Sequence, residues 1–139
     1  MAKTPIAGVV LKNDKGEYLL VQESKPSAYG LWNWPAGHVE EGETLAGAAR
    51  RETKEETGYT VAIANSEPVY ESPGDHGTNH YLYLFIGEVL DGTLQAQADE
   101  LLDAKWLSVG EIRRLDAENQ TRGSWVVAAI NKLESQEAA

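Results

Sequence analysis

The sequence predicts a single α/β domain with a mixed β-sheet, arranged as an α/β/α sandwich. The chain has 139 residues, of which 42% are hydrophobic, enough to bury one core. Strand-like and helix-like patterns follow one another irregularly, which favours a mixed sheet over regular βαβ winding. No internal repeat, low-complexity tract or linker divides the chain. We therefore expect one domain over residues 1–139, with a frayed tail at 135–139.

The first strands are predicted on either side of a turn. Residues 6–11 and 18–23 have strand-like composition, and the turn residues Asn13 to Gly16 between them give a hairpin signal. A short third strand is expected over residues 31–36. The sequence therefore predicts an antiparallel hairpin followed by a strand that leads into a helix.

The best-defined helix is predicted over residues 45–57. Thr44 is a suitable N-cap, and Gly58 is a natural residue to follow the last turn. At about 100° per residue, one stripe of the helix combines apolar and acidic side chains. Its members are Leu45, Ala48, Ala49, Glu52, Glu55 and Glu56. A core-facing stripe therefore becomes acidic halfway along the helix.

The rest of the chain is predicted to contain three more strands and two helices. The strands are expected at residues 60–71, 80–89 and 104–107, and the helices at 109–115 and 124–133. Residues 72–79 contain proline, glycine, aspartate and asparagine and are predicted to form a loop.

The three glutamates of the stripe need cationic compensation. They repel one another and lie near the negative end of the helix dipole. Arg51 can reach Glu55 or Glu43, but one guanidinium cannot neutralise the cluster. Oxygen ligands of this kind favour Mg²⁺, with Mn²⁺ as a substitute. The alternative is a solvated acidic helix face that carries ion pairs.

The spacing of these residues resembles the Nudix box over residues 37–59. The matching positions are Gly37, Glu43, Arg51, Glu52, Glu55, Glu56 and Gly58. Two positions depart from the family pattern: Thr53 stands where an aliphatic residue is usual, and Ala36 replaces the first of two glycines. The resemblance implies the Nudix fold and the hydrolysis of nucleoside diphosphates linked to another moiety.

The resemblance also implies roles for individual residues. Glu52, Glu55, Glu56 and the carbonyl of Gly37 would bind metal, and Arg51 and Glu43 would orient the cluster. The general base would be Glu52 or a glutamate outside the box. Glu100 is the first choice for such a residue and Asp103 the second, against the alternative of a solvated acidic loop.

Aromatic and histidine side chains outside the helix are candidates for substrate binding. We expect Trp32 and Trp34 to face opposite sides of their strand, so that at most one of them stacks on a base or ring and the other is in the core. His76 and His80 are candidates for contacting phosphate, although exposed loop histidines are common. Tyr81 is a further candidate and shares a face with Tyr83.

The expected substrate is a nucleoside triphosphate or a similar small nucleoside diphosphate derivative, cleaved by water attack at phosphorus. ADP-ribose, a nucleotide sugar or a pyrimidine pyrophosphate is the alternative, and a non-catalytic nucleotide sensor is another. We expect the protein to act as a monomer or homodimer.

Composition excludes several other classes. The net charge of −10 argues against binding a nucleic-acid polymer. The absence of cysteine removes disulfide and thiolate chemistry, and the histidine spacing does not match a zinc motif. Without a run of 18 apolar residues or a signal peptide, a soluble cytoplasmic protein with no membrane partner is expected.

Overall fold

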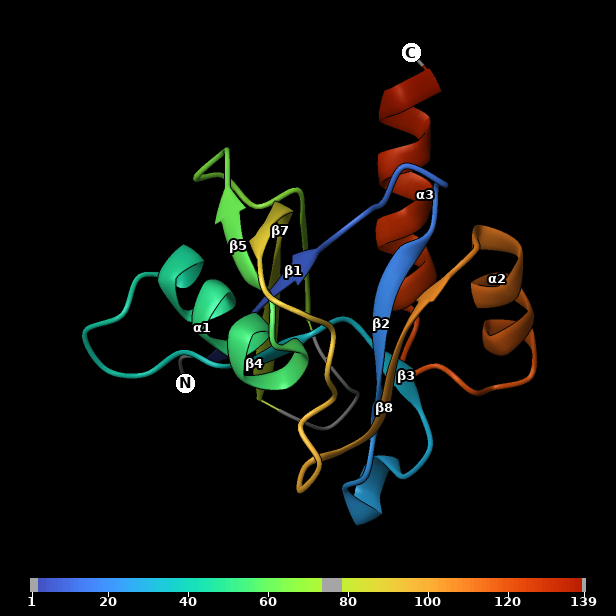
Figure 1. Ribbon diagram of the computed structural model, residues 1–139, viewed down its shortest axis with the longest axis horizontal. Coiled ribbons are helices and arrows are strands. Elements are labelled where there is room, and N and C mark those ends of the chain that lie inside the picture. Colours follow the sequence, from blue (N-terminus) through green and yellow to red (C-terminus); the bar gives the residue numbers. More distant parts are fainter. Residues whose placement is uncertain (1–2, 74–78, 139) are drawn as a thin grey trace.

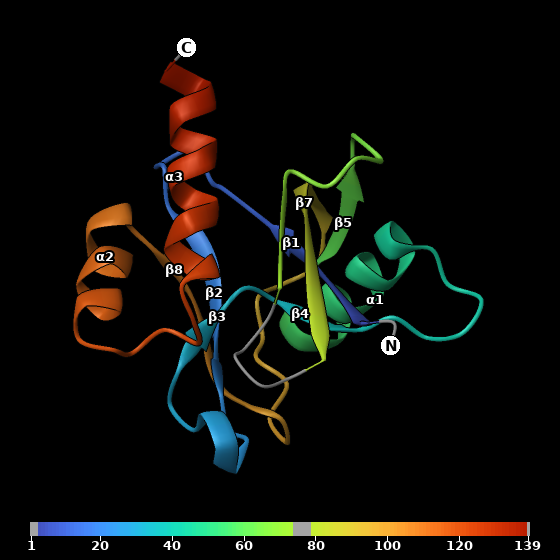
Figure 2. The same cartoon turned by 180° about the vertical axis from the view of Figure 1, so that it is seen from behind.

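The computed structural model describes residues 3–73 and 79–138, and it consists of two β-sheets flanked by helices (Figures 1 and 2). In chain order, the elements are β1 (Thr4–Val10), β2 (Tyr18–Glu23), the 3₁₀ turn η1 (Pro26–Ala28), β3 (Trp32–Asn33), β4 (Ala36–His38), α1 (Leu45–Thr57), β5 (Thr60–Ile63), β6 (Tyr70–Pro73), β7 (His80–Asp91), β8 (Leu101–Leu107), α2 (Val109–Ala117) and α3 (Trp125–Ala138).

The larger sheet contains five strands in the order β4-β1-β7-β5, and β6 also pairs with β7. Strands β1 and β7 are parallel, whereas their other pairings are antiparallel. The smaller sheet has the order β3-β2-β8 and is antiparallel. The predicted α/β class with mixed strand directions is therefore confirmed.

The predicted hairpin is only partly correct. Its turn forms, and the Gly16 amide donates to the Asn13 carbonyl at 3.0 Å. The two strands nevertheless enter different sheets, and an isolated bridge between Lys12 and Tyr18 joins them beside the turn. The reason is that β4 and β7 occupy the two edges of β1, so β2 pairs with β3 and β8 instead.

Two hydrophobic clusters lie on opposite sides of the larger sheet. Alternate residues of β1 supply both, because successive side chains of a strand point to opposite faces. Ala7 and Val9 pack in the cluster that includes Ala48 and Ala49 of α1. Val10 belongs to the cluster that includes α3. Figures 1 and 2 show the corresponding arrangement, with α1 on one side of the sheets and α2 and α3 on the other.

Helix α1 begins and ends where the sequence predicts. The Thr44 hydroxyl accepts a hydrogen bond from the Gly47 amide at 3.0 Å. At the other end, Gly58 has a φ of 83°, in the left-handed region that favours glycine, and its amide donates to the Lys54 carbonyl. These local signals fix the helix boundaries.

The buried face of α1 differs from the predicted stripe. Thr53 is fully buried, and its hydroxyl donates to the Ala49 carbonyl at 2.8 Å. This hydrogen bond satisfies the Thr53 hydroxyl and so allows a polar residue at a fully buried position. The Glu55 side chain is 47% exposed, so its predicted place in the core-facing stripe was wrong. Thr53 and Thr57 complete that stripe instead.

Several other boundaries also differ. The predicted strand over 31–36 is interrupted at Pro35, which separates β3 from β4, and the strand predicted over 60–71 is divided into β5 and β6. Helix α3 continues through the predicted frayed tail to Ala138, and Lys12 forms ion pairs with Glu134 and Glu137 along it. Residues 74–78 of the predicted loop lie outside the described residues.

Within 3–73 and 79–138, none of the helices is both long and apolar enough to cross a membrane.

Candidate active site

Two cavities adjoin each other at the end of β4. The acidic cavity, of about 550 Å³, contains Glu52, Glu56 and Glu100 in its wall. The side cavity, of about 120 Å³, contains Asn33, His80, Arg122 and Trp125. The two share five lining residues, namely Glu23, Lys25, Ala36, Gly37 and His38. A molecule that spans this shared wall would contact acidic groups at one end and cationic and aromatic groups at the other.

Glu56 is a buried carboxylate that accepts a hydrogen bond from the backbone. Its residue is 9% exposed, and its Oε1 accepts the Ala36 amide at 3.2 Å. Burial raises the pKa of Glu56 well above its usual value, and repulsion from Glu52 and Glu23 raises it further. The ionised form of Glu56 is therefore stabilised if a cation is present in the acidic cavity.

The carboxylate of Glu52 lies directly against the backbone of Gly37. A Cβ at Gly37 would overlap this carboxylate, so only glycine permits the approach. Burial raises the pKa of Glu52, and the hydrogen bond from Arg51 opposes that rise. Gly37 thus brings a backbone segment and a half-buried carboxylate together at the wall of the acidic cavity.

Arg51 connects the loop before α1 with the carboxylates of the helix. Its Nε and Nη2 donate to the two oxygens of Glu43 at 2.8 and 2.9 Å. Its Nη1 donates to Glu52 at 2.8 Å and to Glu55 at 3.1 Å, and Nη2 also reaches the His38 carbonyl. The guanidinium lowers the pKa of Glu43 to about 2. The expected contacts of Arg51 with Glu43 and Glu55 are confirmed.

The loop before β8 brings one of the two proposed additional acids to the site. Glu100 lines the acidic cavity together with Asp99, and the Ser24 hydroxyl donates to the Glu100 carbonyl at 2.7 Å. Asp103 lies within β8, where its Oδ1 accepts the Ala104 amide and its Oδ2 is 3.6 Å from Lys105 Nζ. The structure therefore places Glu100 at the acidic cavity, and Asp103 is not among the residues lining it.

The acidic cavity offers ligands of the kind that a hard divalent cation binds. Carboxylates of Glu52 and Glu56 and the backbone of Gly37 are all oxygen donors at its wall. Glu55 is outside this lining set and is held by Arg51. In the described part of the chain, no three histidine, aspartate or glutamate side chains converge closely enough to hold an ion. Buried Glu56 and the close approach at Gly37 nevertheless fit such a cation.

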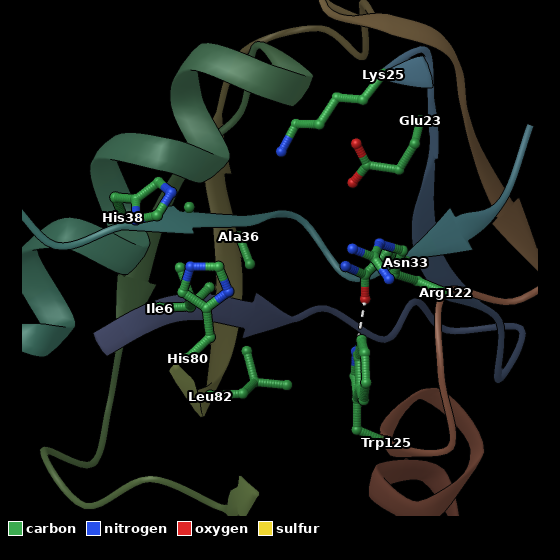
Figure 3. Close-up of a pocket in the computed structure, with 11 residues that line it drawn as sticks. Ile6, Glu23, Lys25, Asn33, Ala36, His38, His80, Leu82, Arg122 and Trp125 are labelled. Carbon is green, nitrogen blue, oxygen red and sulfur yellow. Dashed lines mark hydrogen bonds between the residues drawn. The ribbon is translucent and has the colours of Figure 1, made fainter. Parts of the chain in front are cut away.

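The side cavity combines cationic groups with a ring and aliphatic side chains (Figure 3). Lys25 and Arg122 supply positive charge. The rings of His80 and His38 pack edge to face with centroids 5.4 Å apart. Trp125, at the start of α3, donates its indole N–H to Asn33 Oδ1 at 3.0 Å. His80 is thus the one predicted substrate-binding residue found among the described residues that line this cavity.

The other predicted substrate-binding residues lie elsewhere. Trp32 and Trp34 both belong to the hydrophobic core, so the expectation that they face opposite sides was wrong. Residues two apart in an extended segment share a face, and Asn33 between them lines the side cavity. Tyr81 packs against Tyr83 with centroids 5.0 Å apart and does not line either cavity. His76 lies outside the described residues.

Sequence reasoning missed most of the side cavity. Asn33, Arg122 and Trp125 come from two distant segments that only the fold brings together. One signal was available: if both neighbouring tryptophans are core residues, Asn33 must face the other way. No comparable local signal identifies Arg122 or Trp125.

Comparisons with known proteins agree with this arrangement. The family model for the NUDIX domain matches residues 2–127. A NUDIX hydrolase from Nitrosomonas europaea has a similar structure, with a TM-score of 0.80, 28% identity, and coverage of 96% of this chain and 90% of that one. The fold and the carboxylate-lined cavity thus define a class of hydrolase, and the chain belongs to the Nudix family.

Two relatives illustrate the range of the family. Phosphatase NudJ of Escherichia coli O1:K1 / APEC is 32% identical over 113 residues, which cover 81% of this chain and 73% of the relative. The 8-oxo-dGDP phosphatase NUDT18 of Danio rerio is 38% identical over 104 residues, which cover 73% of this chain. The match spans only 31% of the length of the Danio rerio protein.

Proposed function

We propose that this protein is a divalent-metal-dependent pyrophosphohydrolase that cleaves a diphosphate linkage in a nucleoside triphosphate or a similar small nucleoside diphosphate derivative. The observation that carries the proposal is the shared wall between the acidic cavity and the side cavity. A nucleotide has the matching division into a metal-binding polyphosphate and a planar base. Family membership supports the reaction type.

The residues proposed to hold Mg²⁺ or Mn²⁺ are Glu52, Glu55, Glu56 and the carbonyl of Gly37. A bound divalent ion neutralises phosphate charge and lowers the pKa of water. The protein's own contribution is to keep the carboxylates in place, and Arg51 does so for Glu52 and Glu55 through the hydrogen bonds described above.

The proposed reaction is attack of water on phosphorus, with no covalent enzyme intermediate. The new bond joins the water oxygen to phosphorus, and the bond from phosphorus to the bridging oxygen of the diphosphate breaks. The water proton passes to a carboxylate of the acidic cavity, for which Glu52 and Glu100 are the candidates. Lys25, which lines both cavities, is positioned to offset negative charge on the phosphates.

A substrate panel tests the proposal. Release of phosphate or pyrophosphate is measured from nucleoside triphosphates, 8-oxo-dGDP, ADP-ribose, nucleotide sugars and pyrimidine pyrophosphates, with Mg²⁺ and with EDTA. We expect metal-dependent turnover of at least one nucleotide, abolished by Glu56→Gln. Glu118→Gln, at an exposed carboxylate beside α2, is the matched control and retains activity.

Two outcomes would contradict the proposal. Turnover that persists in EDTA would exclude the metal-dependent reaction. Mg²⁺ binding without turnover of any member of the panel would favour the alternative of a nucleotide sensor.

A further inference from the structure

The segment that joins β7 to β8, residues 92–100, is docked on the last turn of α1. The Gln95 amide donates to the Thr57 carbonyl at 2.9 Å, and the Gln97 amide donates to the Glu56 carbonyl at 3.1 Å. The last carbonyls of a helix have no partner within the helix, so these two bonds satisfy groups that would otherwise need water. Figures 1 and 2 show the segment passing beside α1. The segment is therefore fixed to the helix turn that carries Glu56.

Two backbone hydrogen bonds in series connect Glu56 to Glu100. The first is the bond from the Gln97 amide to the Glu56 carbonyl, and the second runs from the Glu100 amide to the Gln97 carbonyl at 3.1 Å. The Leu101 amide donates to the same Gln97 carbonyl at 2.8 Å, and the Ser24 hydroxyl donates to the Glu100 carbonyl at 2.7 Å. Glu56 and Glu100 both line the acidic cavity. The backbone of Gln97 thus sets where Glu100 lies relative to the buried carboxylate.

Two glycines allow the segment to approach α1 this closely. Gly58 and Gly92 have φ values of 83° and 103°, both in the left-handed region that favours glycine. A Cβ at Gly92 would overlap the Gly58 carbonyl oxygen, and a Cβ at Gly58 would overlap the Thr93 carbonyl oxygen. Leu94, which follows this contact, packs against two core clusters. A side chain at either glycine must therefore move the start of the segment away from the helix.

We infer that Gly92 is a positioning residue for the reaction, because its close contact with Gly58 docks the segment on α1 and so holds the Glu100 carboxylate at the acidic cavity. This inference rests on the proposed function, in which Glu100 is one of two candidates to take the water proton. It adds that the helix that carries the proposed metal ligands also holds this proton acceptor, although the two are far apart in the sequence.

The experiment is a double-mutant cycle of Gly92→Ala and Glu100→Gln, with kcat and KM measured on the substrate that wild type turns over fastest. Loss of a general base lowers kcat by about 10²–10⁴-fold, and its misplacement by about 1 Å lowers kcat by about 10²-fold. We expect each single variant to lose kcat in these ranges with little change in KM. In the Glu100→Gln background, Gly92→Ala should have no further effect, because no carboxylate remains to be misplaced.

Gly16→Ala is the matched control. Gly16 also has a positive φ, of 78°, but a Cβ there meets open space in the turn after β1. The control therefore introduces comparable backbone strain away from both cavities and should leave kcat unchanged. If Gly92→Ala reduces kcat by the same factor with and without the Glu100 carboxylate, its effect is a general loss of structure and the inference is overturned.

Amide hydrogen exchange of wild type tests the docking without any variant. The Gln95 and Gln97 amides should exchange about 10²-fold or more slowly than in an unfolded peptide, and Gly92→Ala should remove most of this protection. Unprotected amides in wild type would overturn the inference even if Gly92→Ala does not fold.

Two results separate this inference from the proposed function. If Glu100→Gln retains the wild-type kcat while Glu56→Gln is inactive, the inference is overturned and the proposed function stands. If wild type turns over no member of the substrate panel, the proposed function fails. Protection of Gln95 and Gln97 that Gly92→Ala removes would then still support the docking of the segment by Gly92.

Discussion

Substituting Glu56 by glutamine removes a buried negative charge and preserves the shape of the side chain. The glutamine oxygen can accept the Ala36 amide as the carboxylate does at 3.2 Å. Glu56, which carries the lost charge, is 9% exposed, and the carboxylates of Glu52 and Glu23 repel that charge. Without divalent metal, Glu56→Gln should therefore be more stable than wild type. Desolvation of a buried charge costs several kcal/mol, and partial protonation in wild type reduces this to a net gain of about 1–2 kcal/mol for the variant.

Thermal unfolding in EDTA and in Mg²⁺ measures this effect. For a domain of 139 residues, this gain in the free energy of unfolding corresponds to a rise in Tm of about 3–7 °C in EDTA. Saturating Mg²⁺ should stabilise wild type, by about 2.7 kcal/mol at a hundredfold excess over Kd, and the variant by less. Glu55→Gln is the control, because this exposed carboxylate on the same helix should change stability by less than about 0.5 kcal/mol in EDTA. A Glu56→Gln protein that unfolds below wild type in EDTA would refute the reasoning.

Three further substitutions test separate parts of the structure. Gly37→Ala must displace the Glu52 carboxylate, and we expect turnover to fall by about tenfold or more, so a variant with the wild-type rate would contradict this. Arg51→Lys loses the planar fork that holds the carboxylates and should lower kcat/KM by about 10–100-fold, whereas unchanged kinetics would argue against a positioning role. Tyr18→Phe removes the hydroxyl that donates to Glu134 at 2.8 Å and should cost about 0.5–1 kcal/mol at pH 7 in urea unfolding. This hydrogen bond lowers the pKa of Glu134 below its usual value of 4.5. Its contribution to stability is therefore present above pH 4.5 and should be lost as the pH falls through the lower pKa that Glu134 has in the folded state. A difference in stability between wild type and Tyr18→Phe that persists at about pH 2 would show that packing is responsible.

Local signals were sufficient to predict the helix that carries the carboxylates. Thr44 and Gly58 act within one turn of the helix ends, so their effects depend little on the rest of the fold. The side chains of Arg51 and Glu43 are eight residues apart and could also be paired from the sequence. Glu55 was misplaced because a stripe drawn at 100° per residue does not determine how far the buried face extends.

The remaining features depend on contacts between distant segments. Asn33 and Trp125 are 92 residues apart, and their hydrogen bond exists only because α3 packs beside β3. The choice of partner for β2 depends on which strands already occupy the edges of β1. A turn signal between two strands specifies a change of direction and leaves that choice open.

Helix α3 begins beside the side cavity, and its C-terminal part lies beside Lys12, in the segment between β1 and β2. Trp125 binds Asn33 at its start, and Glu134 pairs with Lys12 near its end. Fourteen residues at about 1.5 Å each give a length of about 21 Å. The chain contains no cysteine, so Ser135→Cys on an exposed part of α3 would create a single labelling position. A fluorophore there would be far enough from the cavity not to obstruct it and close enough for energy transfer to a fluorescent nucleotide.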